Sequence, residues 1–160
     1  MLLTAGGVIA VVVVFIIAVS LASFTDSSAS KGNTVTAGQA ALGLSPSGQI
    51  VSAANMRPGD ARSGDVEVTN SGERADLSLT VNAPGSAFTS ALKLKVTPRG
   101  EPANVLYNGA FAAPAPIQLG TLGKGGSKSF TLSISLPQGT VSSLGGSELN
   151  AGFVWEARTQ

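Results

Sequence analysis

The chain has 160 residues, with ten Lys and Arg against nine Asp and Glu, and it contains neither His nor Cys. This length suits a single domain, and a nearly balanced charge without a basic stripe speaks against a nucleic-acid partner. Without His and Cys, the chain lacks the Ser–His or Cys–His pairs of common hydrolases and the ligands of a usual zinc site. The sequence therefore indicates no catalytic residue and no cofactor.

Residues 1–22 predict an export signal, because they are uncharged and mostly apolar, and the first charged residue is Asp26. Ser20 and Ala22 place small side chains where signal peptidase needs them for a cut between Ala22 and Ser23. The segment has no basic residue ahead of its apolar run, which leaves an upstream start codon open, and its length also fits a retained membrane anchor. In either case we expect a protein that is secreted or held at the cell surface, with membrane contact only through an uncleaved signal.

Residues 23–32 predict a flexible N-terminal arm, which is polar apart from one aromatic side chain. An extended segment with an aromatic anchor can add to an unpaired sheet edge of a neighbouring molecule. The arm is therefore a candidate donor strand, and an ordinary disordered terminus is the alternative. The candidate assembly residues are Ser23, Phe24, Thr25 and Asp26.

Residues 33–160 contain short runs that alternate apolar and polar positions, separated by Gly, Pro and Asn. This pattern is typical of strands that are covered on one face. No connection is long and periodic enough for a crossover helix, so the sequence predicts an all-β fold, an antiparallel β-sandwich of jelly-roll type. In chain order, the predicted strands span residues 33–44, 49–51, 63–70, 76–82, 91–96, 104–107, 127–136 and 149–158.

The best candidate for a hairpin is the pair of runs at residues 63–70 and 76–82, with a turn at Asn70-Ser71-Gly72 between them. The glycine-rich segment 120–126 predicts a long turn before the strand at 127–136, because no strand-to-helix context for a phosphate loop surrounds it.

Three of the nine carboxylates lie close together in the sequence, at Asp60, Asp65 and Glu67. Asp65 and Glu67 share one face of a predicted strand, and Asp60 lies in the loop before it. A hard cation such as calcium could use these oxygens together with backbone carbonyls. The alternative is a solvated outer face, since an alternating strand must place its polar residues somewhere.

Several segments, in this order, resemble the TasA/camelysin family of bacterial secreted proteins. The match covers nearly the whole chain, although each segment is short. The segments are the apolar signal, Phe24-Thr25-Asp26-Ser27, the stretch 32–38, Asn55-Met56-Arg57-Pro58-Gly59-Asp60 followed by 64–72, and Phe153-Val154-Trp155-Glu156-Ala157 with the terminal Gln160.

The resemblance implies a jelly-roll domain, export through a dedicated signal peptidase and assembly into extracellular biofilm-matrix fibres. In such fibres the freed arm of one subunit acts as a donor strand for the next, which here gives Phe24 the role of anchor. We therefore expect a structural subunit that forms a homopolymer. The alternatives are a camelysin-type cell-surface metalloendopeptidase, for which this chain lacks any His, and a monomeric adhesion or binding module.

Overall fold

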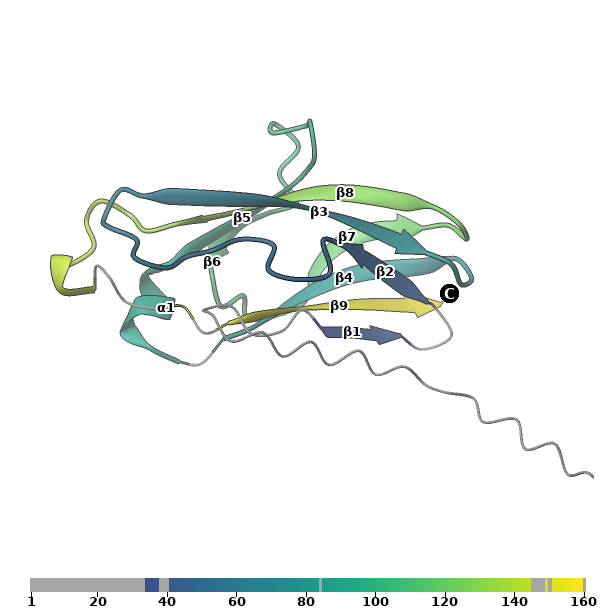
Figure 1. Ribbon diagram of the computed structural model, residues 1–160, viewed down its shortest axis with the longest axis horizontal. Coiled ribbons are helices and arrows are strands. Elements are labelled where there is room, and N and C mark those ends of the chain that lie inside the picture. The colour runs from purple at the N-terminus through teal and green to yellow at the C-terminus, as the bar shows by residue number, and fades with distance from the viewer. Residues whose placement is uncertain (1–33, 38–40, 84, 145–148, 150, 160) are drawn as a thin grey trace, which may run out of the picture.

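The computed structural model describes residues 34–37, 41–83, 85–144, 149 and 151–159 (Figure 1). The predicted signal at 1–22 and arm at 23–32 lie outside these ranges. The strands are β1 (Thr34–Ala37), β2 (Leu42–Ser45), β3 (Ala61–Asn70), β4 (Ala75–Asn82), β5 (Lys93–Pro98), β6 (Tyr107–Ala110), β7 (Ile117–Leu122), β8 (Ser127–Ser135) and β9 (Gly152–Thr159), with the short helices α1 (Ala87–Ala91) and η1 (Ser142–Leu144).

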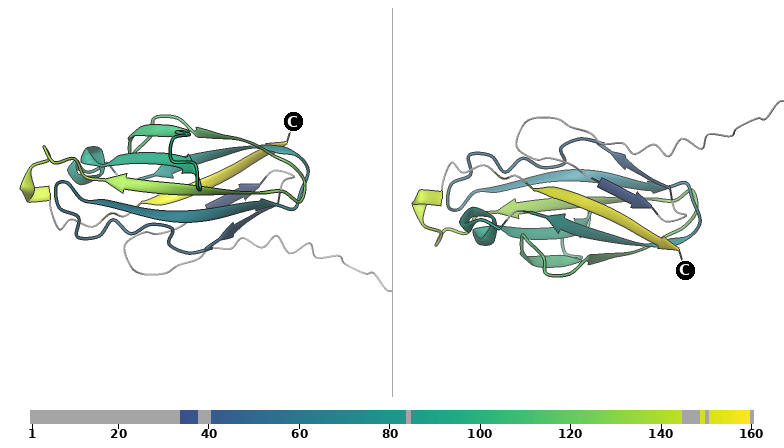
Figure 2. Two further views of the ribbon diagram at one scale, coloured as in Figure 1. Left: turned by 90° about the horizontal axis from the view of Figure 1, so that it is seen from above. Right: turned by 90° about the horizontal axis from the view of Figure 1, so that it is seen from below.

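These strands form two sheets that lie face to face (Figures 1 and 2). One sheet has the order β1-β9-β4-β7 and the other has the order β2-β3-β8-β5-β6. Pairing is antiparallel throughout the described strands except between β1 and β9, which run parallel. The predicted all-β class is thus confirmed, and the expectation of purely antiparallel pairing is wrong at this one pair.

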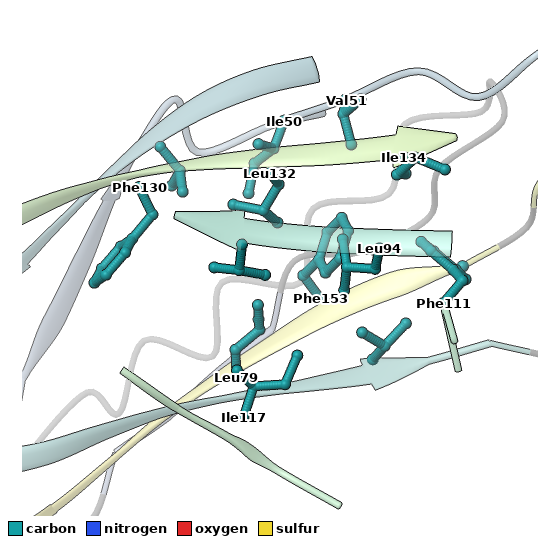
Figure 3. Packing of buried hydrophobic residues seen from close by; sticks show 14 of the residues in the cluster. Ile50, Val51, Leu79, Leu94, Phe111, Ile117, Phe130, Leu132, Ile134 and Phe153 are labelled. Atoms are coloured by element: carbon teal, nitrogen blue, oxygen red, sulfur yellow. The ribbon is translucent and has the colours of Figure 1, made fainter. Parts of the chain in front are cut away.

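The core lies between the two sheets, where each strand places every second side chain inward. On β8 the buried residues are Phe130, Leu132 and Ile134, and on β9 they include Phe153 and Trp155, as the alternation predicts. Figure 3 shows side chains from both sheets meeting in this layer. Burying such aliphatic and aromatic groups contributes roughly 1.5–3 kcal/mol per side chain, so this layer is the main source of stability.

The predicted hairpin between residues 63–70 and 76–82 is wrong, although both strands exist. β3 pairs with β2 and β8, whereas β4 pairs with β7 and β9 in the other sheet. The short connection at 71–74 therefore crosses from one sheet to the other instead of joining neighbours. Alternation determines which face of a strand is buried, but it does not determine which strand lies beside it.

Two predicted strands at the start of the domain also need correction. The run 33–44 contains two separate strands, because β1 joins the four-stranded sheet and β2 joins the five-stranded sheet. Residues 49–51 form no strand, yet Ile50 and Val51 are buried in the core. Their burial explains the apolar signal that predicted a strand there.

Later in the chain, the predicted strand 104–107 is displaced, because β6 begins only at Tyr107. The predicted long turn at 120–126 is shorter than expected, since β7 continues to Leu122. Gly120 lies within that strand with φ of +85°, a backbone conformation that suits glycine. The sequence analysis therefore missed β7.

Gly64 on β3 lies directly against the backbone at Ile50. A Cβ atom at position 64 would be only 1.8 Å from the carbonyl oxygen of Ile50 and 2.7 Å from its carbonyl carbon. The absence of a side chain thus lets the irregular segment at 49–51 pack onto the sheet.

We expect Gly64→Ala to lower the free energy of unfolding by about 1–3 kcal/mol or more, because backbone atoms cannot rotate away as a side chain can. Gly139→Ala is the matched control, since a Cβ at Gly139 has no heavy atom within 4 Å. Urea denaturation of both variants measures the difference. Equal stability of the two variants would contradict the close packing at Gly64.

The buried side chain of Asn70 stabilises the connection at 71–74, which crosses between the sheets. Its Nδ2 donates to the carbonyl oxygens of Glu73, at 2.7 Å, and of Leu122, at 3.3 Å. Its Oδ1 accepts a hydrogen bond from the backbone N–H of Gly72 at 3.0 Å. One side chain therefore links the turn after β3 to the end of β7.

An exposed ion pair lies next to this corner, with 2.8 Å between Lys124 Nζ and Glu73 Oε1. The hydrogen bond from Lys124, followed by its charge, lowers the pKa of the Glu73 carboxyl below its ordinary value. The pair therefore contributes at neutral pH, and its contribution disappears as the pH falls through the lowered pKa. Both side chains are about two-thirds exposed, at 67% for Lys124 and 68% for Glu73, so solvent screens the pair. The hydrogen bonds of Asn70 therefore contribute more to the stability of this corner than the ion pair does.

We expect Asn70→Ala to cost about 1–3 kcal/mol, because it leaves buried carbonyl groups without a donor. Asn104→Ala is the control, since the Asn104 amide bonds only the exposed carboxylate of Glu101, at 3.1 Å, and its loss should cost less than about 0.5 kcal/mol. Thermal unfolding of the two variants checks this order. A control that loses as much stability as Asn70→Ala would contradict it.

Candidate assembly site

The first described strand, β1, lies along the last strand, β9, at the edge of the four-stranded sheet (Figure 1). Four parallel pairs join them, from Thr34 with Val154 to Ala37 with Ala157. On its other side β9 pairs with β4 along all eight residues, from Gly152 to Thr159. In the described register, β1 therefore covers half of β9 and leaves two residues at each end uncovered.

The two sheets end in four edge strands among the described residues. The strands β1 and β2 lie on one lateral side, and the strands β6 and β7 lie on the opposite side, as both views in Figure 2 show. An edge strand carries N–H and C=O groups that can pair with another strand. We call these two regions the β1/β2 side and the β6/β7 side.

The β6/β7 side carries two features that disturb its edges. On β6, the Tyr107 hydroxyl donates to the Ala110 carbonyl oxygen at 2.8 Å, and its ring lies so close that a Cβ at Gly109 would be 2.7 Å from the hydroxyl oxygen. On β7, the register shifts so that Leu119 has no partner on β4. An aromatic side chain folded along an edge and a β-bulge both hinder strand addition.

Sequence analysis missed these edge features. The spacing Tyr-x-Gly at Tyr107 and Gly109 was available as a signal, because residues two apart on a strand share one face. Its meaning depends on β6 being an edge strand, and that follows only from the sheet order. The bulge at Leu119 could not be recognised in the sequence, because Gly120 directly after it was assigned to the predicted turn at 120–126.

The residues predicted for export and assembly lie outside the described ranges. They are Ala22, Ser23, Phe24, Thr25 and Asp26. The cleavage and the arm therefore stay predictions. Within the described ranges, no helix has the length and apolar character needed to cross a bilayer.

The structure separates the three carboxylates that the sequence suggested for a cation. Asp60 accepts from the Arg57 backbone N–H at 2.9 Å, and Asp65 accepts from the Thr131 hydroxyl at 2.6 Å. In extended chain, the seven residue-to-residue steps from Asp60 to Glu67 span about 23 Å, whereas the oxygens around one calcium ion lie within about 5 Å of one another. In the part of the chain that the structure describes, no three Asp, Glu, His or Cys side chains are grouped to hold a metal.

Basic side chains lie across β8 from these carboxylates, on β5 and directly after it. The register places Lys95 level with Ser133 and Ser63, and Arg99 Nε lies 3.0 Å from Asp65 Oδ2. The sequence pattern could not place β5 near Asp65, because that depends on the order of the strands in the sheet. This surface is a balanced polar face, and it offers no concentration of negative charge to a cation.

Comparison with models of known protein families and with curated proteins finds no match for this chain. The resemblance to the TasA/camelysin family therefore remains a prediction from the sequence.

We expect millimolar calcium to leave the thermal unfolding midpoint unchanged relative to a chelator, because an ion that binds only the folded state would raise it. Differential scanning calorimetry in the two buffers checks this. A calcium-dependent increase that disappears in Glu67→Gln would contradict the separation of the carboxylates and restore the cation hypothesis.

Proposed function

We propose that this protein is a secreted structural subunit of extracellular biofilm-matrix fibres, a jelly-roll domain that assembles by donating its N-terminal arm to a neighbour. The observation that carries the proposal is the position of β1. The first described strand already adds to a sheet as an edge strand, in parallel with β9. An N-terminal segment of this chain is thus suited to strand addition, and the predicted arm directly precedes that segment.

The register of β1 argues that the arm reaches beyond its own domain. Thr34 pairs with Val154, so only Phe153 and Gly152 remain on β9 for residues that precede Thr34. An arm that starts at Ser23 has more residues than these two positions can pair. Because β1 runs parallel to β9, an arm that continues its direction leaves at the end where β9 begins, and a second subunit would supply the missing partner strand.

A donor arm and an open edge on the same molecule give a heterologous contact, in which one surface binds a different surface of the next copy. Such a contact repeats without closing unless its rotation forms a ring, and it therefore produces a fibre.

We expect Phe24→Asp to abolish fibres while the domain still folds. Burying an unpaired charge in a neighbour costs several kcal/mol, whereas every described strand lies between Thr34 and Thr159 and loses nothing. Ser27→Asp is the matched control, because position 27 lies on the opposite face of an extended arm. Electron microscopy of the chain from Ser23 onward, with circular dichroism for folding, gives the result. Normal fibres from Phe24→Asp would overturn the donor-arm mechanism.

Sequencing the N-terminus of the protein recovered from its host tests the export step. A start at Ser23 supports the proposed release of the arm. A protein that retains residues 1–22 in fibres would show that the arm does not need cleavage, and a retained, monomeric protein would favour a surface-anchored binding module.

A further inference from the structure

The sequence contains one Asn–Gly pair, and it lies in an edge strand. Asn108 and Gly109 are the two central residues of β6, which among the described strands pairs with β5 alone (Figure 1). Asparagine is a chemically labile residue, and a following glycine favours attack by the backbone on its side chain, because glycine has no Cβ to hinder the approach. The position of this pair in the fold therefore bears on the chemical lifetime of the protein.

The side chain of Asn108 is accessible and unrestrained. It is exposed, and no hydrogen bond holds its carboxamide within the described residues. The asparagines elsewhere in the domain include two that are held: Asn70 donates to two carbonyl oxygens, and Asn104 donates to the carboxylate of Glu101 at 3.1 Å. Of these three side chains, that of Asn108 rotates most readily toward the backbone.

Pairing with β5 keeps the reacting atoms of the Asn–Gly pair apart. A five-membered ring between the Gly109 nitrogen and Cγ of Asn108 closes only when the backbone rotates away from the extended conformation. The Phe111 N–H donates to the Leu92 carbonyl oxygen at 3.0 Å, and the register pairs Leu94 with Gly109 two residues away. Hydrogen-bonded pairs recur at every second residue of an antiparallel ladder, so the Gly109 N–H is also engaged. The reaction therefore requires β6 to separate locally from β5.

Tyr107 restrains this separation. Its hydroxyl donates to the Ala110 carbonyl oxygen at 2.8 Å, and a Cβ atom at Gly109 would lie only 2.7 Å from the same hydroxyl oxygen. The ring therefore lies against Gly109 and joins the two ends of the strand. A short edge strand with one neighbour otherwise opens easily, because few contacts hold it.

From these observations we infer that Asn108 is a site of non-enzymatic deamidation, and that the opening of β6, restrained by Tyr107, sets its rate. In the first step the Gly109 nitrogen loses its proton and bonds to Cγ of Asn108, and the side-chain nitrogen leaves as ammonia. In the second step water adds to a carbonyl carbon of the resulting succinimide and opens the ring, which leaves aspartate or isoaspartate at position 108. The net change consumes water, releases ammonia and replaces an amide by a carboxylate. The inference does not depend on the proposed function.

The product changes β6 and the loop beside it. The register places Asn108 level with Lys95, whose Nζ donates to the Pro102 carbonyl oxygen at 3.3 Å. A carboxylate at position 108 offers Lys95 a charged partner, which competes with this bond. The isoaspartate form also adds a carbon atom to the backbone and so breaks the regular pairing with β5. We therefore expect deamidation to loosen β6 and the connection at 99–106.

Incubation of the folded protein in mildly alkaline buffer, followed by peptide mapping with mass spectrometry, tests the site. We expect Asn108 to react at least about tenfold faster than Asn70 and Asn104, and about tenfold faster again in urea, where β6 is released. Conversion that begins at Asn70 or Asn104, or none at Asn108, would overturn the site. Equal rates at Asn108 in buffer and in urea would overturn its control by β6.

The Tyr107→Phe variant tests the restraint, because it removes the hydroxyl that bonds Ala110 and keeps the ring. We expect Asn108 to react about three- to tenfold faster in buffer and at an unchanged rate in urea, since the variant alters the opening of the strand and not the chemistry. Ser71→Ala is the matched control: its hydroxyl donates to the Ala41 carbonyl oxygen at 3.2 Å, beyond the end of β3, which β8 and β5 separate from β6. Circular dichroism checks that both variants are folded. A Tyr107→Phe chain that reacts no faster than the control would overturn the restraint.

Discussion

The contact between Trp155 on β9 and Phe130 on β8 joins the two sheets across the core. Their ring centroids lie 6.0 Å apart at an interplanar angle of 35°, and Trp155 is fully buried. The indole Nε1 has no hydrogen-bond partner in the described part of the chain, so the side chain is held by packing alone. An unpaired buried donor costs about 1–3 kcal/mol, yet the large area of a buried indole outweighs this cost. The same residue pairs through its backbone with Leu79 and with Val35, so the edge that receives β1 is supported directly by the core.

The buried faces of most strands could be predicted from the sequence. Val66 and Val68 on β3, and Phe130 and Leu132 on β8, point inward as their alternation indicates. This succeeds because a strand beside a core has one simple constraint, that every second residue meets apolar neighbours. The shared face of Asp65 and Glu67 follows from the same rule, since both are exposed on the outer side of β3.

Neighbour relations could not be predicted in the same way. The turn after Asn70 reads as a hairpin, but its side chain bonds the carbonyl oxygen of Leu122 on β7 and so holds a crossing between the sheets. Gly64 makes room for the carbonyl group of Ile50, a role that no feature of the strand pattern around it indicates. Both features depend on contacts between segments far apart in the chain, and a local sequence pattern carries no information about such contacts. The candidate assembly site is the hardest part to predict, because a strand can be identified as an edge strand only once the order of strands is known.

One open side and one arm per molecule is the arrangement that a linear polymer requires. If both lateral sides accepted strands, each subunit could bind two arms and assembly would branch or spread into sheets. If both sides were closed, an arm would have no place to bind. The Tyr107 hydroxyl and the bulge at Leu119 disturb one side, while β1 and β2 retain a regular register on the other. In the proposed fibre, this difference between the two sides limits where an arm can add.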